Sequence, residues 1–349
     1  MRAPADRPFY VVKGGEGVSS SRYAAIIGWG MAVPEQVVTN ADLAQRIDTS
    51  DEWIRSRTGI AERRVAGPGV FTSTLATIAG REAMERAGVS PADIDMVIVA
   101  TCTPDRPFPA TACAVQANLG ITRAPAFDIA AACSGFVYGI SVATGMIKSG
   151  MSRRLLLIAA DIFTHLIDWD DRNTCVLFGD GAGAVVLQAT DERLGLLSTL
   201  IGAAGEGETM MAVDAGGTRM PATPDILAQG RQYVYMNGRE IFKHAVREMC
   251  DSAMRALGEA GLSLSDISLI IPHQANVRII EAVTKRLELP AERVVVNIDR
   301  YGNTSAASIP IALYEAVQQG RVKDGDYLLL TAFGGGLTWG SAVIRWGRP

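Results

Sequence analysis

Residues 87–100, Ala-Gly-Val-Ser-Pro-Ala-Asp-Ile-Asp-Met-Val-Ile-Val-Ala, recur in similar form at residues 260–271, Ala-Gly-Leu-Ser-Leu-Ser-Asp-Ile-Ser-Leu-Ile-Ile. The offset between the copies is the same for the leading alanine (260 − 87 = 173) and for the aspartate before the strand (266 − 93 = 173). In each copy a helix-favouring stretch ends at a glycine, and a short loop leads into an apolar run of strand length. This constant offset predicts a duplicated αβ unit, although two unrelated αβ units can also resemble each other by chance.

Further apolar runs alternate with helical stretches along the chain. We expect strands near residues 24–28, 96–100, 126–129, 155–160, 184–187, 196–202, 269–271, 293–297, 327–332 and 341–345. The alternation predicts an α/β fold of layered, buried sheets, with two similar halves that pack through shared helices. We place these halves at residues 22–190 and 191–349, after a flexible amino-terminal extension at 1–21. Residues 202–230 show no periodicity and are predicted to form a long loop.

The composition argues against several classes of protein. The 349 residues carry 33 Lys and Arg against 37 Asp and Glu, a net charge of −4, whereas nucleic-acid binders usually need a strongly basic face. No apolar run approaches the roughly 20 residues that span a bilayer, so we expect no membrane association. Residues 1–21 lack the apolar core of a secretory signal, which favours a cytoplasmic protein. Five cysteines without zinc-like spacing predict neither a disulfide framework nor a metal site.

Cys133 is the candidate nucleophile. It lies in residues 127–136, Phe-Asp-Ile-Ala-Ala-Ala-Cys-Ser-Gly-Phe, where a predicted strand leads directly into a helix. The free N–H groups and the positive dipole at a helix start favour the thiolate, and the small neighbours leave room for a substrate. The alternative for this residue, and our interpretation of the other four cysteines, is a small buried apolar side chain.

Two other candidate side chains also follow predicted strands. His273 ends the second copy of the repeated strand, within Ile-Pro-His-Gln-Ala-Asn at 271–276, and sites in α/β proteins gather at the carboxyl ends of strands. Asn303 stands at a helix start, where an asparagine is first of all an N-cap. Because Asn303 follows Cys133 at nearly the repeat offset (303 − 133 = 170), we expect two matching turns to face each other with His273 between them.

Glycine runs mark two further turns. Gly334 to Gly336 follow a predicted strand, and backbone N–H groups there can approach a ligand as an oxyanion hole requires. A flexible hairpin turn is the alternative for this run. The run Gly-Asp-Gly-Ala-Gly-Ala at 179–184 matches no nucleotide-binding pattern and is predicted to be a close-packed turn.

Together these motifs resemble those of the 3-oxoacyl-[acyl-carrier-protein] synthase III family, the initiating condensing enzymes of bacterial type II fatty acid synthesis. The resemblance covers residues 23–346 and implies the family's thiolase-like fold. The matching motifs, in order, are Thr-Ser-Asp-Glu-Trp-Ile at 49–54, Arg-Thr-Gly-Ile at 57–60, Ala-Ala-Cys-Ser-Gly at 131–135, Phe-Gly-Asp-Gly-Ala-Gly at 178–183, Pro-His-Gln-Ala-Asn at 272–276, Gly-Asn-Thr-Ser at 302–305 and the glycines at 334–336.

The resemblance implies a decarboxylative Claisen condensation. Cys133 would take the acyl group of an acyl-CoA primer, and a malonyl group on acyl carrier protein would then lose carbon dioxide and attack the acyl-cysteine. His273 and Asn303 would donate hydrogen bonds to the malonyl thioester oxygen, while the N–H groups of Cys133 and Gly335 would hold the acyl oxyanion. This chemistry needs no metal and no organic cofactor.

The resemblance also implies roles in substrate binding and assembly. For CoA, Trp53 and Arg57 would hold the adenine with Arg172 on its other side, and Asn276 and Phe333 would line the pantetheine tunnel. In a homodimer, Phe108 would close the acyl pocket of the partner subunit, unless it is an ordinary buried aromatic. Acidic carrier protein would dock on a basic face, unless that face is merely solvated; its residues would be Lys243, Arg278, Lys285 and Arg286.

Three other functions fit part of this pattern. Papain-like thiol hydrolases also order Cys, His and Asn at this spacing, but they show Cys-Gly-Ser-Cys-Trp around the nucleophile where this chain has Ala-Ala-Cys-Ser-Gly. Relatives of the same fold acylate other acceptors or condense acyl groups in specialised metabolism. A non-catalytic acyl-CoA or carrier-protein binding module would keep the fold and lose Cys133, His273 or Asn303, all of which are present.

Overall fold

The computed structural model describes residues 23–349, so the extension expected at 1–21 lies outside the described residues. Nine strands form one mixed sheet in the order β11-β12-β13-β8-β1-β7-β6-β4-β5. Their bounds are β1 Tyr23–Ala32, β4 Met96–Ala100, β5 Ala126–Ile129, β6 Arg154–Asp161, β7 Gly181–Thr190, β8 Gly195–Ala203, β11 Ile267–Pro272, β12 Tyr327–Gly334 and β13 Thr338–Arg345. Two small ribbons pair β2 (Val37–Thr39) with β3 (Glu62–Arg64) and β9 (Met211–Ala212) with β10 (Tyr235–Met236).

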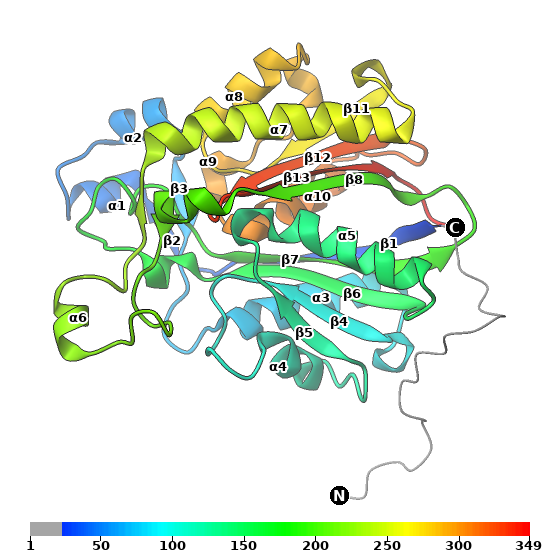
Figure 1. Ribbon diagram of the computed structural model, residues 1–349, viewed down its shortest axis with the longest axis horizontal. Helices are drawn as coiled ribbons and strands as arrows, with labels where there is room; N and C mark the ends of the chain where they lie inside the picture. Colours follow the sequence, from blue (N-terminus) through cyan, green and yellow to red (C-terminus); the bar gives the residue numbers. More distant parts are fainter. Residues whose placement is uncertain (1–22) are drawn as a thin grey trace, which may run out of the picture.

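Helices lie outside and between the two halves of this sheet (Figure 1). The α-helices of the described chain are α1 Asn40–Ala44, α2 Asp51–Thr58, α3 Thr72–Ala87, α4 Thr111–Asn118, α5 Gly135–Lys148, α6 Pro224–Ala228, α7 Gly238–Ala260, α8 Val277–Arg286, α9 Ile298–Tyr301 and α10 Ser308–Gln318. Helices α3 and α4 cover the outer face of the first half, and α7 and α8 cover that of the second. The result is a layered α/β arrangement, which confirms the predicted fold class. Across residues 23–349 no helix is both long and apolar enough to cross a membrane.

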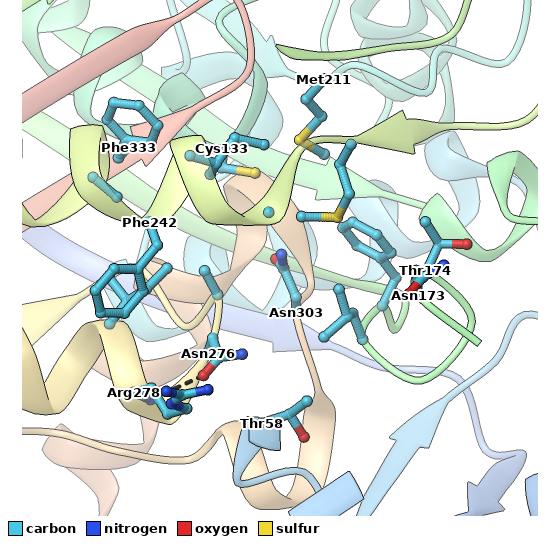
Figure 2. Close-up of a pocket in the computed structure, with 18 of the residues that line it drawn as sticks. Thr58, Cys133, Asn173, Thr174, Met211, Phe242, Asn276, Arg278, Asn303 and Phe333 are labelled. Atoms are coloured by element: carbon cyan, nitrogen blue, oxygen red, sulfur yellow. Dashed lines mark hydrogen bonds between the residues drawn. The ribbon is translucent and has the colours of Figure 1, made fainter. Parts of the chain in front are cut away.

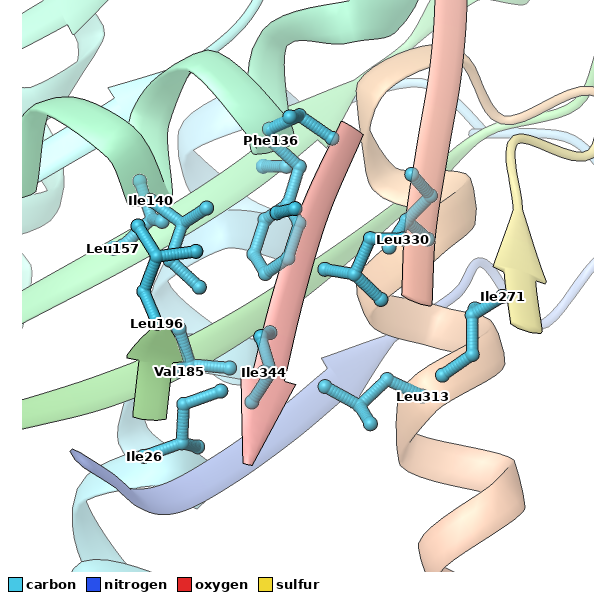
Figure 3. Packing of buried hydrophobic residues seen from close by; sticks show 14 of the residues in the cluster. Ile26, Phe136, Ile140, Leu157, Val185, Leu196, Ile271, Leu313, Leu330 and Ile344 are labelled. Carbon is cyan, nitrogen blue, oxygen red and sulfur yellow. The ribbon is translucent and has the colours of Figure 1, made fainter. Parts of the chain in front are cut away.

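The main core lies around the central helices α5 and α10. Phe136 and Ile140 of α5 and Leu313 of α10 are buried against strand residues from both halves of the sheet (Figure 3). The sequence of α5, Gly-Phe-Val-Tyr-Gly-Ile-Ser-Val-Ala-Thr-Gly-Met-Ile-Lys, is apolar around most of its circumference. Such a helix is stable only when it is covered on several sides, which explains its place between the two halves.

The two halves repeat the same strand pairing. In the first half β4 pairs with β6 in parallel, β6 with β7 antiparallel and β7 with β1 antiparallel; in the second, β11, β12, β13 and β8 pair in the same way. The offset found in the sequence also relates the first residues of β6 and β12 (327 − 154 = 173) and of α5 and α10 (308 − 135 = 173). The repeat seen in one αβ unit therefore extends through the sheet and the central helices.

The halves meet between β1 and β8 through the single pair Ala24 and Gly195. We expected two separate sheets, and this pair instead joins them into one. Gly195 has a φ of +72°, and a Cβ atom there would collide with the carbonyl oxygen of Ala24. A glycine is therefore required at this junction. The boundary that we predicted near residue 190 falls in the connection between β7 and β8.

Two local expectations were wrong. Residues 293–297 form no strand, only the isolated bridge between Ile270 and Val294. The buried side chain of Gln274 satisfies two backbone groups of this segment, because it donates to Val295 O (3.1 Å) and accepts from Asn297 N (3.1 Å). The stretch at 202–230 is also not one loop: it contains the end of β8, a 3₁₀ turn at Gly205–Met210, β9 and α6.

Candidate active site

A cavity of about 900 Å³ brings most of the candidate residues together. Figure 2 shows Cys133, Asn303 and Phe333 around it, with Asn276 and Arg278 further along. The predicted residues that line it are Trp53, Arg57, Cys133, Arg172, Lys243, His273, Asn276, Arg278, Asn303, Phe333 and Gly335. Phe108, Lys285 and Arg286 do not line it.

Cys133 lies in a 3₁₀ turn, Ala132–Ser134, between β5 and α5. Its side chain is 5% exposed, and burial raises the pKa of the thiol to about 12, outweighing a hydrogen bond from the Ser305 hydroxyl that lowers it. Burial thus opposes the thiolate that the helix start is expected to favour, because desolvation disfavours the charged form. The thiol proton has to leave as the sulfur bonds to a substrate.

His273 follows β11 directly, and its backbone N–H donates to Thr331 O (2.8 Å). The ring is 2% exposed, and burial lowers its pKa to about 3, so the imidazole is neutral. Its Nδ1 lies 2.6 Å from Ser308 Oγ. A neutral imidazole in this position can donate one hydrogen bond to a bound substrate but cannot supply a positive charge.

Asn303 is held through both its backbone and its side chain. Its N–H donates to Leu177 O (2.8 Å), and its C=O accepts from Gly179 N (3.1 Å). The side-chain Oδ1 accepts from the backbone N–H of Ser305 (2.9 Å), which assigns the opposite end of the amide, the Nδ2 donor, to the cavity. The site thus contains two neutral donor side chains, Asn303 and His273, around one thiol.

The glycine run forms the turn between β12 and β13, beside Cys133. A Cβ atom at Gly334 would lie 2.7 Å from the backbone nitrogen of Cys133, so only glycine leaves this N–H accessible. Gly335, the next residue, lines the cavity. Residues 334–336 therefore form a hairpin turn and also lie where their backbone N–H groups can face the cavity.

A second cavity, of about 610 Å³, also reaches Cys133. Its walls are mainly apolar; they include Val70, Phe71, Cys102, Ile162, Phe163, Leu166, Met211, Val213 and Val234. Cys133, Met211 and Gly335 line both cavities, so the thiol lies at their junction. The sequence analysis missed this cavity, because its walls come from loops and turns without a recognisable period.

Trp53 and Arg57 lie one helical turn apart on α2, and both line the first cavity. The guanidinium of Arg172 lies over the Trp53 ring, 4.7 Å from its centre, and also donates to Asp48 O (2.8 Å). A planar ring inserted between them needs about 7 Å, twice the usual contact distance. Arg172 would therefore have to move outward for Trp53 and Arg172 to enclose an adenine.

The predicted basic residues fall into two groups. Lys243 and Arg278 line the first cavity, and Arg278 N donates to the capping Oδ1 of Asn276 (2.9 Å) at the start of α8. Lys285 and Arg286 lie at the other end of α8, where Arg286 pairs with Asp251 (3.0 Å). The predicted basic residues therefore extend from the cavity, at Lys243 of α7 and Arg278, to the far end of α8.

Phe108 is 86% exposed and outside both cavities. The alternative that it is an ordinary buried aromatic is therefore wrong for this chain. Its loop neighbours Pro104, Asp105 and Pro107 do line the second cavity. Nearby in the fold, β5 is the last strand of the sheet, and one of its edges has no neighbouring strand among the described residues.

Comparisons with known proteins agree with this geometry. Two family models match: 3-oxoacyl-[acyl-carrier-protein] synthase III at residues 127–205, and the carboxyl-terminal part of the same family at residues 257–346. The chain is 71% identical to a beta-ketoacyl-[acyl-carrier-protein] synthase III of Roseiflexus sp. over 326 residues, which cover 93% of this chain and 99% of that protein. It is also similar to the crystal structure of a 3-oxoacyl-[acyl-carrier-protein] synthase III from Aquifex aeolicus, with a TM-score of 0.86, 48% identity and coverage of 93% and 100%.

Proposed function

The chain belongs to the 3-oxoacyl-[acyl-carrier-protein] synthase III family, and from this premise we propose how its own residues carry out the family's reaction. The family membership makes it a condensing acyltransferase that initiates fatty acid synthesis, with acyl-CoA and malonyl-loaded acyl carrier protein as substrates. The observation that carries the proposal is the position of Cys133 at the junction of two cavities, beside the donors His273 and Asn303.

In the first half-reaction the Cys133 sulfur attacks the thioester carbon of acyl-CoA. The carbon–sulfur bond to CoA breaks, and the leaving CoA sulfur takes up the proton that the thiol loses. The acyl chain enters the apolar second cavity, while CoA occupies the first cavity between Cys133 and Trp53. The N–H groups of Cys133 and Gly335 stabilise the oxyanion of the tetrahedral intermediate.

In the second half-reaction the malonyl thioester replaces CoA in the first cavity. Its carbon–carbon bond to the carboxylate breaks, carbon dioxide leaves, and the electron pair moves onto the thioester oxygen as an enolate. His273 and Asn303 stabilise that oxygen by hydrogen bonds. The enolate carbon then attacks the acyl carbon, the bond to the Cys133 sulfur breaks, and the sulfur takes up a proton from water to restore the thiol as 3-oxoacyl carrier protein is released. These steps need neither a metal nor an organic cofactor.

The intact mass of the carrier protein tests this function. The chain is incubated with malonyl carrier protein and a series of straight and branched acyl-CoAs. We expect malonyl carrier protein to be converted into the 3-oxoacyl form for at least one primer, and only when that primer is present. If no primer yields the 3-oxoacyl mass, the proposed function is wrong.

We place carrier-protein docking on the basic face formed by Lys243, Arg278, Lys285 and Arg286, and we test it at Arg278, near the start of α8. Arg278→Glu is expected to raise the KM for malonyl carrier protein at least about tenfold and to leave kcat within about twofold, because opposite charges bring the partners together without taking part in the chemistry. Steady-state kinetics at two salt concentrations measure this, and the effect should shrink at higher salt. Lys323→Glu, an exposed charge change before β12, is the matched control. Equal KM values for both variants would contradict the assignment.

We propose that the chain acts as a homodimer, with Phe108 of each subunit covering the second cavity of its partner. The exposed ring and the open edge of β5 support this arrangement. Sedimentation of the wild type should give the dimer mass, and Phe108→Ala should extend the accepted primers by several carbons. A monomeric wild type that is fully active would overturn the proposal.

We also place the enzyme in the cytoplasm, where reducing conditions keep its thiols free.

A further inference from the structure

Ser308 makes a contact with the active site that the mechanism above does not use. It is the first residue of α10 and is 2% exposed. Its Oγ lies 2.6 Å from His273 Nδ1 and accepts a hydrogen bond from the backbone N–H of Gln274 at 3.3 Å. The hydroxyl therefore joins the ring of His273 to the backbone of the residue that follows it.

The internal repeat shows that the helix start does not need this hydroxyl. The residue that matches Ser308 in the first half is Gly135 (308 − 135 = 173), the first residue of α5. The two have nearly the same backbone conformation, with φ and ψ of −59° and −42° at Ser308 and −53° and −39° at Gly135. The residue that matches His273 is Ala100 (273 − 100 = 173). The second half thus has both the hydroxyl of Ser308 and the imidazole of His273, and the first half has neither at the matching positions.

The ring nitrogen of His273 that carries the proton depends on whether the Ser308 hydroxyl donates to Nδ1 or accepts from it. Burial keeps the imidazole neutral, so it has a single N–H. Because Ser308 Oγ already accepts from the Gln274 amide, its own proton is available to Nδ1. When the hydroxyl donates, Nδ1 accepts, and the ring proton is on Nε2, the nitrogen left for the cavity.

We propose that Ser308 is a positioning residue: its hydroxyl donates to His273 Nδ1 and so keeps Nε2 protonated as the donor to the malonyl thioester oxygen. This inference rests on the proposed function, because it assigns the reason why His273 is able to stabilise the enolate. Without the hydroxyl the proton can move to Nδ1. Nε2 would then direct a lone pair at the thioester oxygen and repel the developing charge.

The kinetic test separates the two half-reactions. Ser308→Ala is expected to slow decarboxylation and condensation by about 10- to 100-fold, the range seen when the partner that orients a metal-binding histidine is lost, taken here as a guide. Acylation of Cys133, followed by intact mass, should stay within about twofold of the wild type. Ser308→Thr, which keeps a hydroxyl, should recover most of the condensation rate. A Ser308→Ala enzyme that is folded and condenses at the wild-type rate would overturn the proposal.

A matched control removes a similar hydrogen bond elsewhere. Ser252 of α7 is also 2% exposed, and its Oγ lies 2.7 Å from Ser341 Oγ. Ser252→Ala should cost a comparable amount of stability in thermal unfolding and leave both half-reactions unchanged. A similar loss of condensation in Ser252→Ala would mean that the Ser308 effect is a general loss of packing, which would contradict the positioning role.

A spectroscopic readout does not depend on turnover. The chain has only three histidines, so nitrogen-15 labelling of histidine gives few signals, and His273→Ala identifies the one of interest. We expect His273 of the wild type to be the Nε2–H tautomer and Ser308→Ala to show a shift toward Nδ1–H. A wild-type His273 protonated at Nδ1 would overturn the inference even if the enzyme is an active synthase. An Nε2–H signal without any 3-oxoacyl product would instead indicate that the proposed function fails.

Discussion

Cys133→Ala is expected to lower the rate of acyl transfer from acyl-CoA by at least about a thousand-fold, since Cys133 is the only thiol that lines both cavities. The measurement is the rate at which the protein gains the acyl mass after mixing with acyl-CoA. The variant loses only the thiol from a turn that is fixed by its backbone, so its thermal unfolding should change little. Formation of 3-oxoacyl carrier protein should fall in the same proportion.

The control for this prediction is a second buried thiol. Cys250 lies in α7 and lines neither cavity, so Cys250→Ala should gain the acyl mass at the wild-type rate. An acyl adduct that forms normally on Cys133→Ala would show that another residue is the nucleophile. The assignment of the two cavities to the acyl chain and to CoA on either side of Cys133 would then be wrong.

His273→Ala and Asn303→Ala are expected to leave acylation nearly intact and to slow condensation by about 100- to 1000-fold each, the effect typical for loss of one donor to a developing oxyanion. Both side chains are neutral donors, so each substitution removes hydrogen bonding and not charge. The measurements are acyl-enzyme formation by intact mass and carbon dioxide release from malonyl carrier protein.

The same variants should differ from a control at a half-buried histidine outside both cavities. His244 of α7 contacts Arg247 at the surface (3.1 Å) and lines neither cavity, so His244→Ala should condense normally. Full decarboxylation by both His273→Ala and Asn303→Ala would contradict the roles given to these residues. Loss of acylation in either variant would instead point to a role in the first half-reaction.

Much of the fold could be predicted from the repeat. The offset found in one αβ unit also relates the turns before α5 and α10, Ala132–Ser134 and Ser305–Ala307. Because strand order follows the repeat, the turn that carries Cys133 and the segment that carries Asn303, two residues before the matching turn, come to face the same cavity. At 293–297, where a strand was expected, the Gln274 side chain bonds Val295 O and Asn297 N, and Val295 N donates to the neighbouring strand β11, at Ile270 O.

Other features of the site depend on contacts between distant segments. The raised pKa of Cys133 comes from burial, which a helix-start pattern does not reveal. The second cavity is built from separate stretches, such as residues 70–72, 102–107 and 211–216, that no local pattern connects. Ser308 was also missed, although one signal was available: aligning the two halves places it opposite Gly135, just as His273 is placed opposite Ala100.

The central claim is that Cys133 holds the acyl group between two half-reactions, and a single-turnover chase tests it most directly. The wild-type enzyme is loaded with acyl-CoA, freed of excess primer, and mixed with malonyl carrier protein while both proteins are followed by intact mass. We predict that the acyl mass on the enzyme disappears at the rate at which 3-oxoacyl carrier protein forms, with the adduct mapped to Cys133. An adduct that persists in the presence of malonyl carrier protein, or product that forms while the adduct remains, would contradict the account.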